Sequence, residues 1–197
     1  MHRLIAIPFL ILLAGLSQPA FAAEQTEPAE KAAPADSKQS RIDNLFQQLK
    51  RERNEKAAER IAGQIWDQWF QSGSASVDLM MQWAQKATQE QKYDVALDFL
   101  DQVITLDPKY AEGWNHRATV HFLMSNYAKS MSDIDHTLAL EPRHFGALSG
   151  MAQILKNTGR KEAALQVYQR VLEIYPMMRN AQNEVATISE ELAGEGI

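Results

Sequence analysis

The sequence predicts an all-α protein built from stacked helical hairpins, and three observations support this prediction. Prolines recur at intervals of 34 residues, at Pro108, Pro142 and Pro176. Small residues and large apolar residues return at the same positions within each interval. The apolar residues also follow the spacings of three and four that indicate a helix with one buried face. We therefore expect a solenoid of about nine helices.

Residues 1–22 predict a secretory signal peptide. A basic start that includes Arg3 precedes an uncharged apolar run over residues 4–16. Residues 20–22 then supply the small-x-small pattern that signal peptidase requires, so we expect cleavage after Ala22. The apolar run is short for a membrane-spanning helix, and an uncleaved membrane anchor is the alternative.

Residues 23–40 predict a disordered linker. This stretch is rich in alanine, glutamate, proline and serine, and it contains no isoleucine, leucine, valine or aromatic residue. It therefore lacks the apolar surface that would offset the entropy lost on ordering it. We expect the linker to give the following domain reach and to have no fold of its own.

Residues 41–76 predict a degenerate N-terminal helical hairpin, which we interpret as a fourth repeat unit. Apolar residues lie on one face of each of its helices: Ile42, Leu45, Phe46, Leu49, Ile61, Ile65, Trp66 and Trp69. Ala62 occupies a small position of the repeat. Ser74 stands where the other units carry proline, which is why we call the unit degenerate.

Three units of 34 residues follow, at 77–110, 111–144 and 145–178. Two positions in each unit hold small residues, which are Ala84, Ala118 and Ala152 at the first and Ala96, Ser130 and Ala164 at the second. Small residues let two antiparallel helices approach closely, and larger apolar residues fill the space between layers. Proline ends the second helix because it lacks an N–H. The first helix ends where the apolar spacing lapses, and Asn126 and Gly159 are suited to end it.

Residues 179–197 predict a C-terminal capping helix and tail. The apolar residues of this segment keep spacings of three and four, and they include Ala181, Val185, Ile188 and Leu192. Acidic residues occupy the other side, among them the adjacent pair Glu190 and Glu191. A solenoid needs such a polar outer face at its end.

The skeleton of the two later units consists of Trp114, Ala118, Tyr127, Ser130 and Pro142, and of Leu148, Ala152, Ala164, Tyr168 and Pro176. With the 34-residue period, this skeleton resembles the tetratricopeptide repeat (TPR) family. The pattern also looks like small repeat proteins that Gram-negative bacteria export, some of them alphaproteobacteria. The resemblance implies a TPR-type solenoid, a right-handed superhelix. In this family the first helix of each unit lines a concave groove that binds a protein or peptide.

The resemblance assigns five groove residues to each unit. Carried over by the 34-residue alignment, they are Asp78, Met81, Gln85, Thr88 and Gln89, then Glu112, Asn115, Thr119, Phe122 and Leu123, then Gly146, Ser149, Gln153, Lys156 and Asn157. Phe122 and Leu123 are candidate anchors for a partner, and the alternative is that they pack under a neighbouring helix. Relatives that clamp the acidic tails of chaperones use lysine, asparagine and arginine in the groove. Here Lys156 is the only cation nearby, so we expect no carboxylate clamp.

Arg117 predicts a structural ion pair with Asp133. The equivalent positions of the flanking units hold Trp83 and Met151, so Arg117 should point into the helical layer. Asp133 follows sixteen residues later on the partner helix and is the expected counter-ion. This combination is a common variant in the family that the sequence resembles. We expect the pair to fix helix packing and to have no role in binding.

The sequence contains no pattern that indicates a catalytic or metal site. It has no cysteine, no Gly-x-Ser-x-Gly motif and no glycine-rich phosphate loop. His116 and His121 are five residues apart and do not share a helical face, and Asp133 with His136 would supply only two ligands. The net charge of −5 is spread along the chain, which argues against nucleic-acid binding. We expect no enzyme activity, no metal and no cofactor.

These features predict a non-catalytic periplasmic scaffold or adaptor, which holds a partner protein or peptide and contributes to organisation of the cell envelope. The alternative is a periplasmic holding chaperone for envelope proteins or apocytochromes, which would use Met81 and the tryptophans Trp66, Trp69 and Trp83 if these are exposed. An enzyme is a third hypothesis without any nominated residues. We expect a monomer without a membrane span after signal cleavage, and weak self-association through the ends is an alternative.

Overall fold

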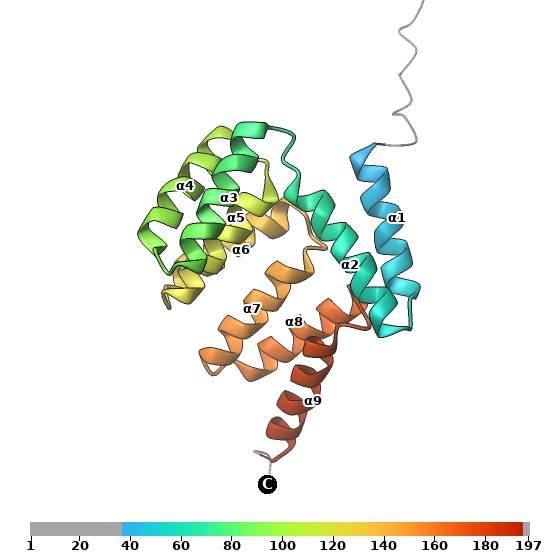
Figure 1. Ribbon diagram of the computed structural model, residues 1–197. Helices are drawn as coiled ribbons and strands as arrows, with labels where there is room; N and C mark the ends of the chain where they lie inside the picture. The colour runs from blue at the N-terminus through green and yellow to red at the C-terminus, as the bar shows by residue number, and fades with distance from the viewer. Residues whose placement is uncertain (1–36, 195–197) are drawn as a thin grey trace, which may run out of the picture. The chain divides into compact units, whose positions relative to one another are not determined.

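The computed structural model describes residues 37–194, and in this range the chain forms α-helices and no strand (Figure 1). The nine helices of the described range are α1 (Lys38–Arg51), α2 (Glu55–Phe70), α3 (Ala75–Gln89), α4 (Tyr93–Leu106), α5 (Ala111–Leu123), α6 (Tyr127–Leu140), α7 (Phe145–Asn157), α8 (Lys161–Ile174) and α9 (Arg179–Gly194). The predicted all-α hairpin fold is confirmed. The predicted signal peptide and the predicted linker up to residue 36 lie outside the described residues, as do residues 195–197.

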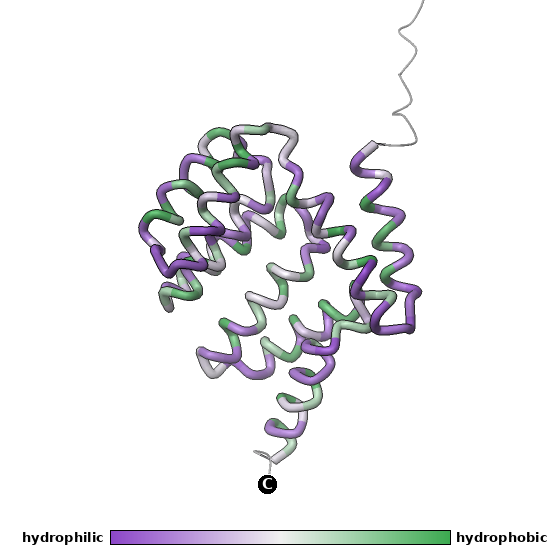
Figure 2. Tube along the Cα trace, in the orientation of Figure 1, coloured by the Kyte–Doolittle hydropathy of each residue, from purple (hydrophilic) through white to green (hydrophobic). Residues whose placement is uncertain are grey.

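The three predicted units form the hairpins α3–α4, α5–α6 and α7–α8. The small residues of the two repeated positions are all buried in these hairpins, namely Ala84, Ala96, Ala118, Ser130, Ala152 and Ala164. Ser130 also donates a hydrogen bond to the carbonyl oxygen of Ala118 at 2.7 Å, so its hydroxyl links α6 to α5. Figure 2 shows hydrophobic and hydrophilic residues alternating along the helices, as expected when each helix buries one face.

The tight turn inside each hairpin places one residue in the left-handed region of backbone space. These residues are Gln91, Ser125 and Gly159, with φ angles of 58°, 59° and 77°. The next residue closes the helix end by a backbone hydrogen bond; for example, the Asn126 N–H donates to the His121 carbonyl at 2.8 Å. Gly159 ends its helix as predicted, but Asn126 does not hold the same place in the second repeat. There Ser125 takes the left-handed conformation, and Asn126 is the residue after it, which donates the closing hydrogen bond.

Helix α1 begins inside the segment that the sequence predicted as linker. The side chain of Ser37 accepts a hydrogen bond from the backbone N–H of Ser40 and so caps the helix, which starts at Lys38. The apolar face that follows includes Ile42 and Leu49, both buried. The predicted linker end at residue 40 is therefore three residues too late, because capping extends the helix beyond its apolar residues.

The N-terminal hairpin α1–α2 does not stack on the first repeat, so our interpretation of it as a fourth unit in the series was wrong. It packs against the third repeat, and Figure 1 shows it on the side of the fold away from α4. The rings of Phe46 and Trp69 lie 6.5 and 5.1 Å from the ring of Phe145. The first repeat has only Val77 at the position of Phe145, so the third repeat offers the hairpin the larger aromatic surface.

Helix α9 closes the third repeat. Ala181 and Ile188 are fully buried, while Glu190 and Glu191 on its outer side are exposed. The C-terminal end of the stack is therefore polar, as a terminal solenoid helix requires. None of the helices in the described residues has both the length and the apolar character needed to cross a membrane.

Candidate functional site

A pocket of about 280 Å³ opens between α5 and α7, the first helices of the second and third repeats. Six residues that the sequence assigned to the groove line it, namely Asn115, Thr119, Phe122, Gly146, Ser149 and Gln153. The remaining wall residues are Ala118, Ser130, Ile134, Ala147, Gly150, Tyr168 and Asn180. No lining residue carries a charge at neutral pH. The volume is close to the lower limit of about 300 Å³ for ligand pockets, which suits one or two side chains of a peptide.

The hydroxyl groups in the pocket have already used their protons. Thr119 Oγ1 donates to the carbonyl oxygen of Asn115 at 3.0 Å, and Ser149 Oγ donates to that of Phe145 at 2.7 Å. Each hydroxyl has one proton, so it presents a ligand with lone pairs only. The amide of Asn115 is held by a 3.0 Å hydrogen bond from its Nδ2 to Glu112 Oε2. The hydroxyls of the pocket therefore favour ligand N–H groups.

Side chains at the far rim of the pocket form a short chain of hydrogen bonds. The hydroxyl of Tyr168 donates to Gln153 Oε1 at 3.2 Å, and Gln153 Nε2 donates to Asn157 Oδ1 at 2.9 Å. Asn157 Nδ2 in turn donates to the hydroxyl of Tyr127 at 3.2 Å. These contacts join α7 to α6 and α8, so the rim is fixed before any ligand arrives.

The two predicted anchors lie in different surroundings. Phe122 is half-buried, lies 5.7 Å from the ring of Tyr127 and lines the pocket. Leu123 is 47% exposed and stands outside the pocket. The predicted cation Lys156 pairs with Glu184 of α9 at 2.6 Å, so its charge is neutralised. Of the two anchors, Phe122 alone faces the candidate site.

The first repeat contributes no residue to the pocket. Met81 is 6% exposed and packs in the apolar core between α3 and α4, so its assignment to the groove was wrong. Asp78 accepts hydrogen bonds from the backbone N–H and the hydroxyl of Ser72 and thereby holds the loop before α3. Thr88 donates to a carbonyl of its own helix, while Gln85 and Gln89 are exposed on α3.

Glu112 is buried rather than exposed in the groove, which corrects our prediction. Its Oε1 lies 2.7 Å from His144 Nε2, and the exposed fraction is 1% for the Glu112 side chain and 0% for that of His144. His144 Nδ1 accepts the N–H of Ala147, so Nε2 carries the proton that is shared with Glu112. Burial acts to raise the pKa of Glu112, but hydrogen bonds from His144 and Asn115 and the nearby ring of His116 hold it below its usual value.

The N-terminal hairpin closes the edge of the groove beside this buried network. The ring of Trp69 stacks on His144 with centroids 4.2 Å apart. Trp66 covers Gly146, where a Cβ atom would come within 2.7 Å of its ring. The sequence did not reveal this contact, although glycine at a groove position was a signal of close approach. Of the tryptophans named for the chaperone alternative, Trp69 is buried and Trp66 half-buried, and only Trp83 is exposed.

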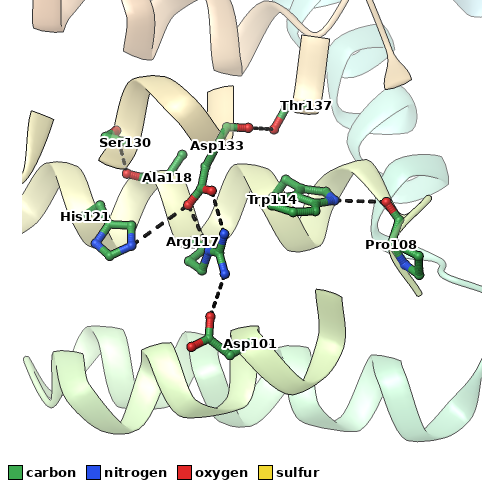
Figure 3. A network of polar contacts seen from close by, with 9 residues as sticks. All are labelled: Asp101, Pro108, Trp114, Arg117, Ala118, His121, Ser130, Asp133 and Thr137. Atoms are coloured by element: carbon green, nitrogen blue, oxygen red, sulfur yellow. Dashed lines mark hydrogen bonds and ion pairs between the residues drawn. The ribbon is translucent and has the colours of Figure 1, made fainter. Parts of the chain in front are cut away.

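The structure contains the predicted pair of Arg117 and Asp133, shown in Figure 3. Arg117 Nε and Nη2 donate to the two carboxylate oxygens at 2.9 and 2.7 Å. Arg117 Nη1 also donates to Asp101 of α4 at 2.6 Å, a partner that the sequence analysis missed. These hydrogen bonds, above all those that Arg117 donates to Asp133, raise the pKa of Arg117. Arg117 also lies over the ring of Trp114, so the network joins α4, α5 and α6.

The histidines and acidic residues do not form a metal site in the part of the chain that the structure describes. No group of three or more such side chains there could hold a metal ion. Glu112 and His144 are buried side by side, and the half-buried His116 lies next to them. Their contacts are the hydrogen bond above and a distance of 3.6 Å between His116 Nε2 and Glu112 Oε2.

Comparisons with known proteins identify the repeat. Residues 146–176 match the tetratricopeptide repeat family. The chain is 50% identical over 188 residues to a TPR repeat-containing protein of Rhizobium etli, covering 95% of this chain and 92% of that relative. Among solved structures, the first TPR of Spaghetti (RPAP3) bound to the HSP90 peptide SRMEEVD is similar, with a TM-score of 0.58 and 28% identity. That match covers 61% of this chain and 95% of the RPAP3 chain.

The match to the Rhizobium etli protein covers nearly the whole of both chains at 50% identity. The solved RPAP3 structure shows independently that the hairpins adopt a TPR arrangement. The chain belongs to the tetratricopeptide repeat proteins.

Proposed function

We propose that this protein is a non-catalytic adaptor of the periplasm, which binds a segment of a partner protein in the pocket between α5 and α7 and helps to organise the cell envelope. The observation that carries the proposal is an uncharged pocket on the first helices of two adjacent repeats. The RPAP3 domain was solved with a peptide bound, which supports a peptide as the class of ligand. The proposed location rests on the signal-peptide pattern of residues 1–22.

The lining of the pocket favours an uncharged peptide segment with an apolar side chain. Phe122 and Ile134 supply an apolar wall for that side chain. The hydroxyls of Thr119 and Ser149 supply acceptors for ligand N–H groups, as described above. An acidic segment would meet these acceptors without a free cation, since Lys156 is paired with Glu184. Burying an unpaired carboxylate in such a site is unfavourable.

Capture from a periplasmic extract tests the adaptor proposal. The bait is the chain from residue 23, compared with a Phe122→Glu variant and a matched Leu140→Glu control. Leu140 is 41% exposed on α6 and lies outside the pocket. We expect a saturable partner that the parent and the control retain and that Phe122→Glu loses, with all three equally helical by circular dichroism.

Equal capture by all three proteins would show that the pocket is not the binding site. Broad suppression of client aggregation without a saturable partner would support the chaperone alternative instead. Cell fractionation tests the location separately, and recovery of the protein with cytoplasmic markers would contradict it.

A further inference from the structure

The first repeat exposes the face that the later repeats use for stacking. Gly113 and Arg117 of α5 lie against α4: a Cβ on Gly113 would meet Val103 at 2.8 Å, and Arg117 bonds Asp101. The equivalent positions of α3, one repeat earlier, are Leu79 and Trp83. They face the place where a preceding second helix would lie.

The third repeat shows the same register. Ala147 and Ile154 of α7 are almost fully buried, in an apolar cluster with Ile134 of α6. This face is therefore an inter-repeat interface in both places where the described chain has a preceding hairpin. In α3 it is uncovered, because α1–α2 packs on the third repeat instead.

The uncovered face is apolar. Leu79, Trp83 and Val95 are 43%, 46% and 44% exposed, which are large values for residues of this size. Trp83 and Phe99 lie 5.4 Å apart and border a shallow hollow of about 340 Å³ between α3 and α4. A contiguous apolar patch of this kind indicates an interaction surface.

Charges of both signs surround the hollow. Lys86, Glu90 and Lys92 contribute to its lining, and Lys92 pairs with Glu90 at 2.7 Å. A patch with an apolar centre and both charges at its rim can face a copy of itself without like-charge repulsion. The ring of Trp83 stands beside a hollow that could receive the same ring of a second molecule.

We propose that two copies of this chain associate through these end faces, with α3 and α4 of one against α3 and α4 of the other about a two-fold axis. Residues 23–36 contain no large apolar residue that would match this face, whereas a second copy brings the same apolar surface. Head-to-tail stacking is disfavoured, since the other end presents the polar outer side of α9. A two-fold arrangement pairs the two apolar faces and closes after two copies.

Sedimentation equilibrium and light scattering of the chain from residue 23 test this proposal, over concentrations from about 1 µM to about 1 mM. We expect the mass to rise from monomer to dimer and to stop there. Trp83→Glu combined with Leu79→Lys should raise the dimer dissociation constant at least about tenfold, as expected for losing buried apolar anchors. The control Leu140→Glu places one charge on an equally exposed leucine elsewhere and should dimerise like the parent.

Circular dichroism and thermal unfolding show whether the double variant still folds, and a single Trp83→Ala variant provides a milder second test. A parent that stays monomeric over the whole range overturns the proposal. So does growth beyond a dimer, which indicates head-to-tail stacking. A dimer that survives in both variants also overturns it, because another face must then hold the copies together.

Discussion

The first and second repeats carry different chemistry at the same two backbone positions. In the first repeat Trp83 and Phe99 form an aromatic pair, and Trp83 remains 46% exposed. In the second repeat the equivalent residues are Arg117 and Asp133, which form a bidentate ion pair, and Asp133 is 3% exposed. The positions are equivalent by the 34-residue period, and the two hairpins differ in what covers them.

The covered position has a polar pair and the open position an apolar one, which reverses the usual placement of such residues. The ion pair is tolerated because Asp101 of the preceding hairpin supplies a second acceptor to Arg117. Among the described residues, no hairpin packs on the outer side of α3, so Trp83 stays exposed there. This contrast indicates that the open end is built for contact with another surface.

Breaking the second-repeat pair should have the largest effect on stability. Asp133→Ala leaves Arg117 without its main counter-ion in a partly buried site, and we expect a loss of about 3 kcal/mol. Removing one partner of a buried ion pair usually costs about 3–5 kcal/mol, and this loss should lie at the lower end because Asp101 still pairs with Arg117. Urea unfolding followed by circular dichroism measures it, and a loss below about 1 kcal/mol would show that the pair is not a main support.

The third repeat supplies a control for the Asp133→Ala substitution. It carries Met151 and Val167 at the equivalent positions, both partly buried against the core. We expect the double variant Arg117→Met with Asp133→Val to recover most of the lost stability, since well-packed apolar residues often replace a buried ion pair at no cost. A double variant as unstable as Asp133→Ala would show that the geometry of the pair itself is required.

The next prediction concerns the third repeat, which the N-terminal hairpin covers, whereas the equivalent face of the first repeat is exposed. Gly146→Ala would place a Cβ within 2.7 Å of the Trp66 ring, and we expect it to cost about 1–3 kcal/mol. Gly150→Ala is the matched control, because its Cβ would meet Ile134 at an ordinary 3.6 Å. Urea unfolding of both variants is the measurement. Equal stability of the two would mean that the hairpin does not press on Gly146.

Acid should lower the free energy of unfolding through residues of the second repeat. The aromatic pair Trp83 and Phe99 of the first repeat has no group that titrates. His116 has a pKa below its usual 6.5, chiefly through burial, and Glu112 has one below its usual 4.5. The unfolded chain therefore binds more protons than the folded chain as the pH falls below about 6.5. The stability from both groups is present above that pH and is lost as the pH falls through the folded values.

Glu112→Gln tests this assignment. The variant cannot ionise and loses the charge in its bonds to His144 and Asn115, so we expect it to cost about 1–2 kcal/mol at pH 7. Unfolding at pH 7, 5.5 and 4 should show a weaker acid dependence in the variant than in the parent below pH 5. An unchanged dependence would place the acid-sensitive group elsewhere.

Period and register alone predicted much of this structure. The spacing of the three prolines placed the repeat hairpins, and the equivalence of Arg117 with Trp83 and Met151 predicted a charge inside the layer with Asp133 as its partner. These inferences succeed because the repeat fixes which positions face one another. The spacing in α2 showed that Trp69 is buried but could not show against which surface. Glu112 was misplaced because its partner, His144, comes from a loop that the helical period does not describe.

The smallest effect concerns the exposed tryptophan of the first repeat. Trp83→Ala removes the contact with Phe99, and aromatic pairs of this kind contribute about 0.5–1.5 kcal/mol. Since nearly half of the side chain is already in water, we expect the monomer to lose less than about 1 kcal/mol, measured at low protein concentration. A loss as large as that of Asp133→Ala would mean that Trp83 supports the fold of its own chain. A small loss, by contrast, leaves a large apolar side chain that the monomer does not need, and its use must then lie in contact with another molecule.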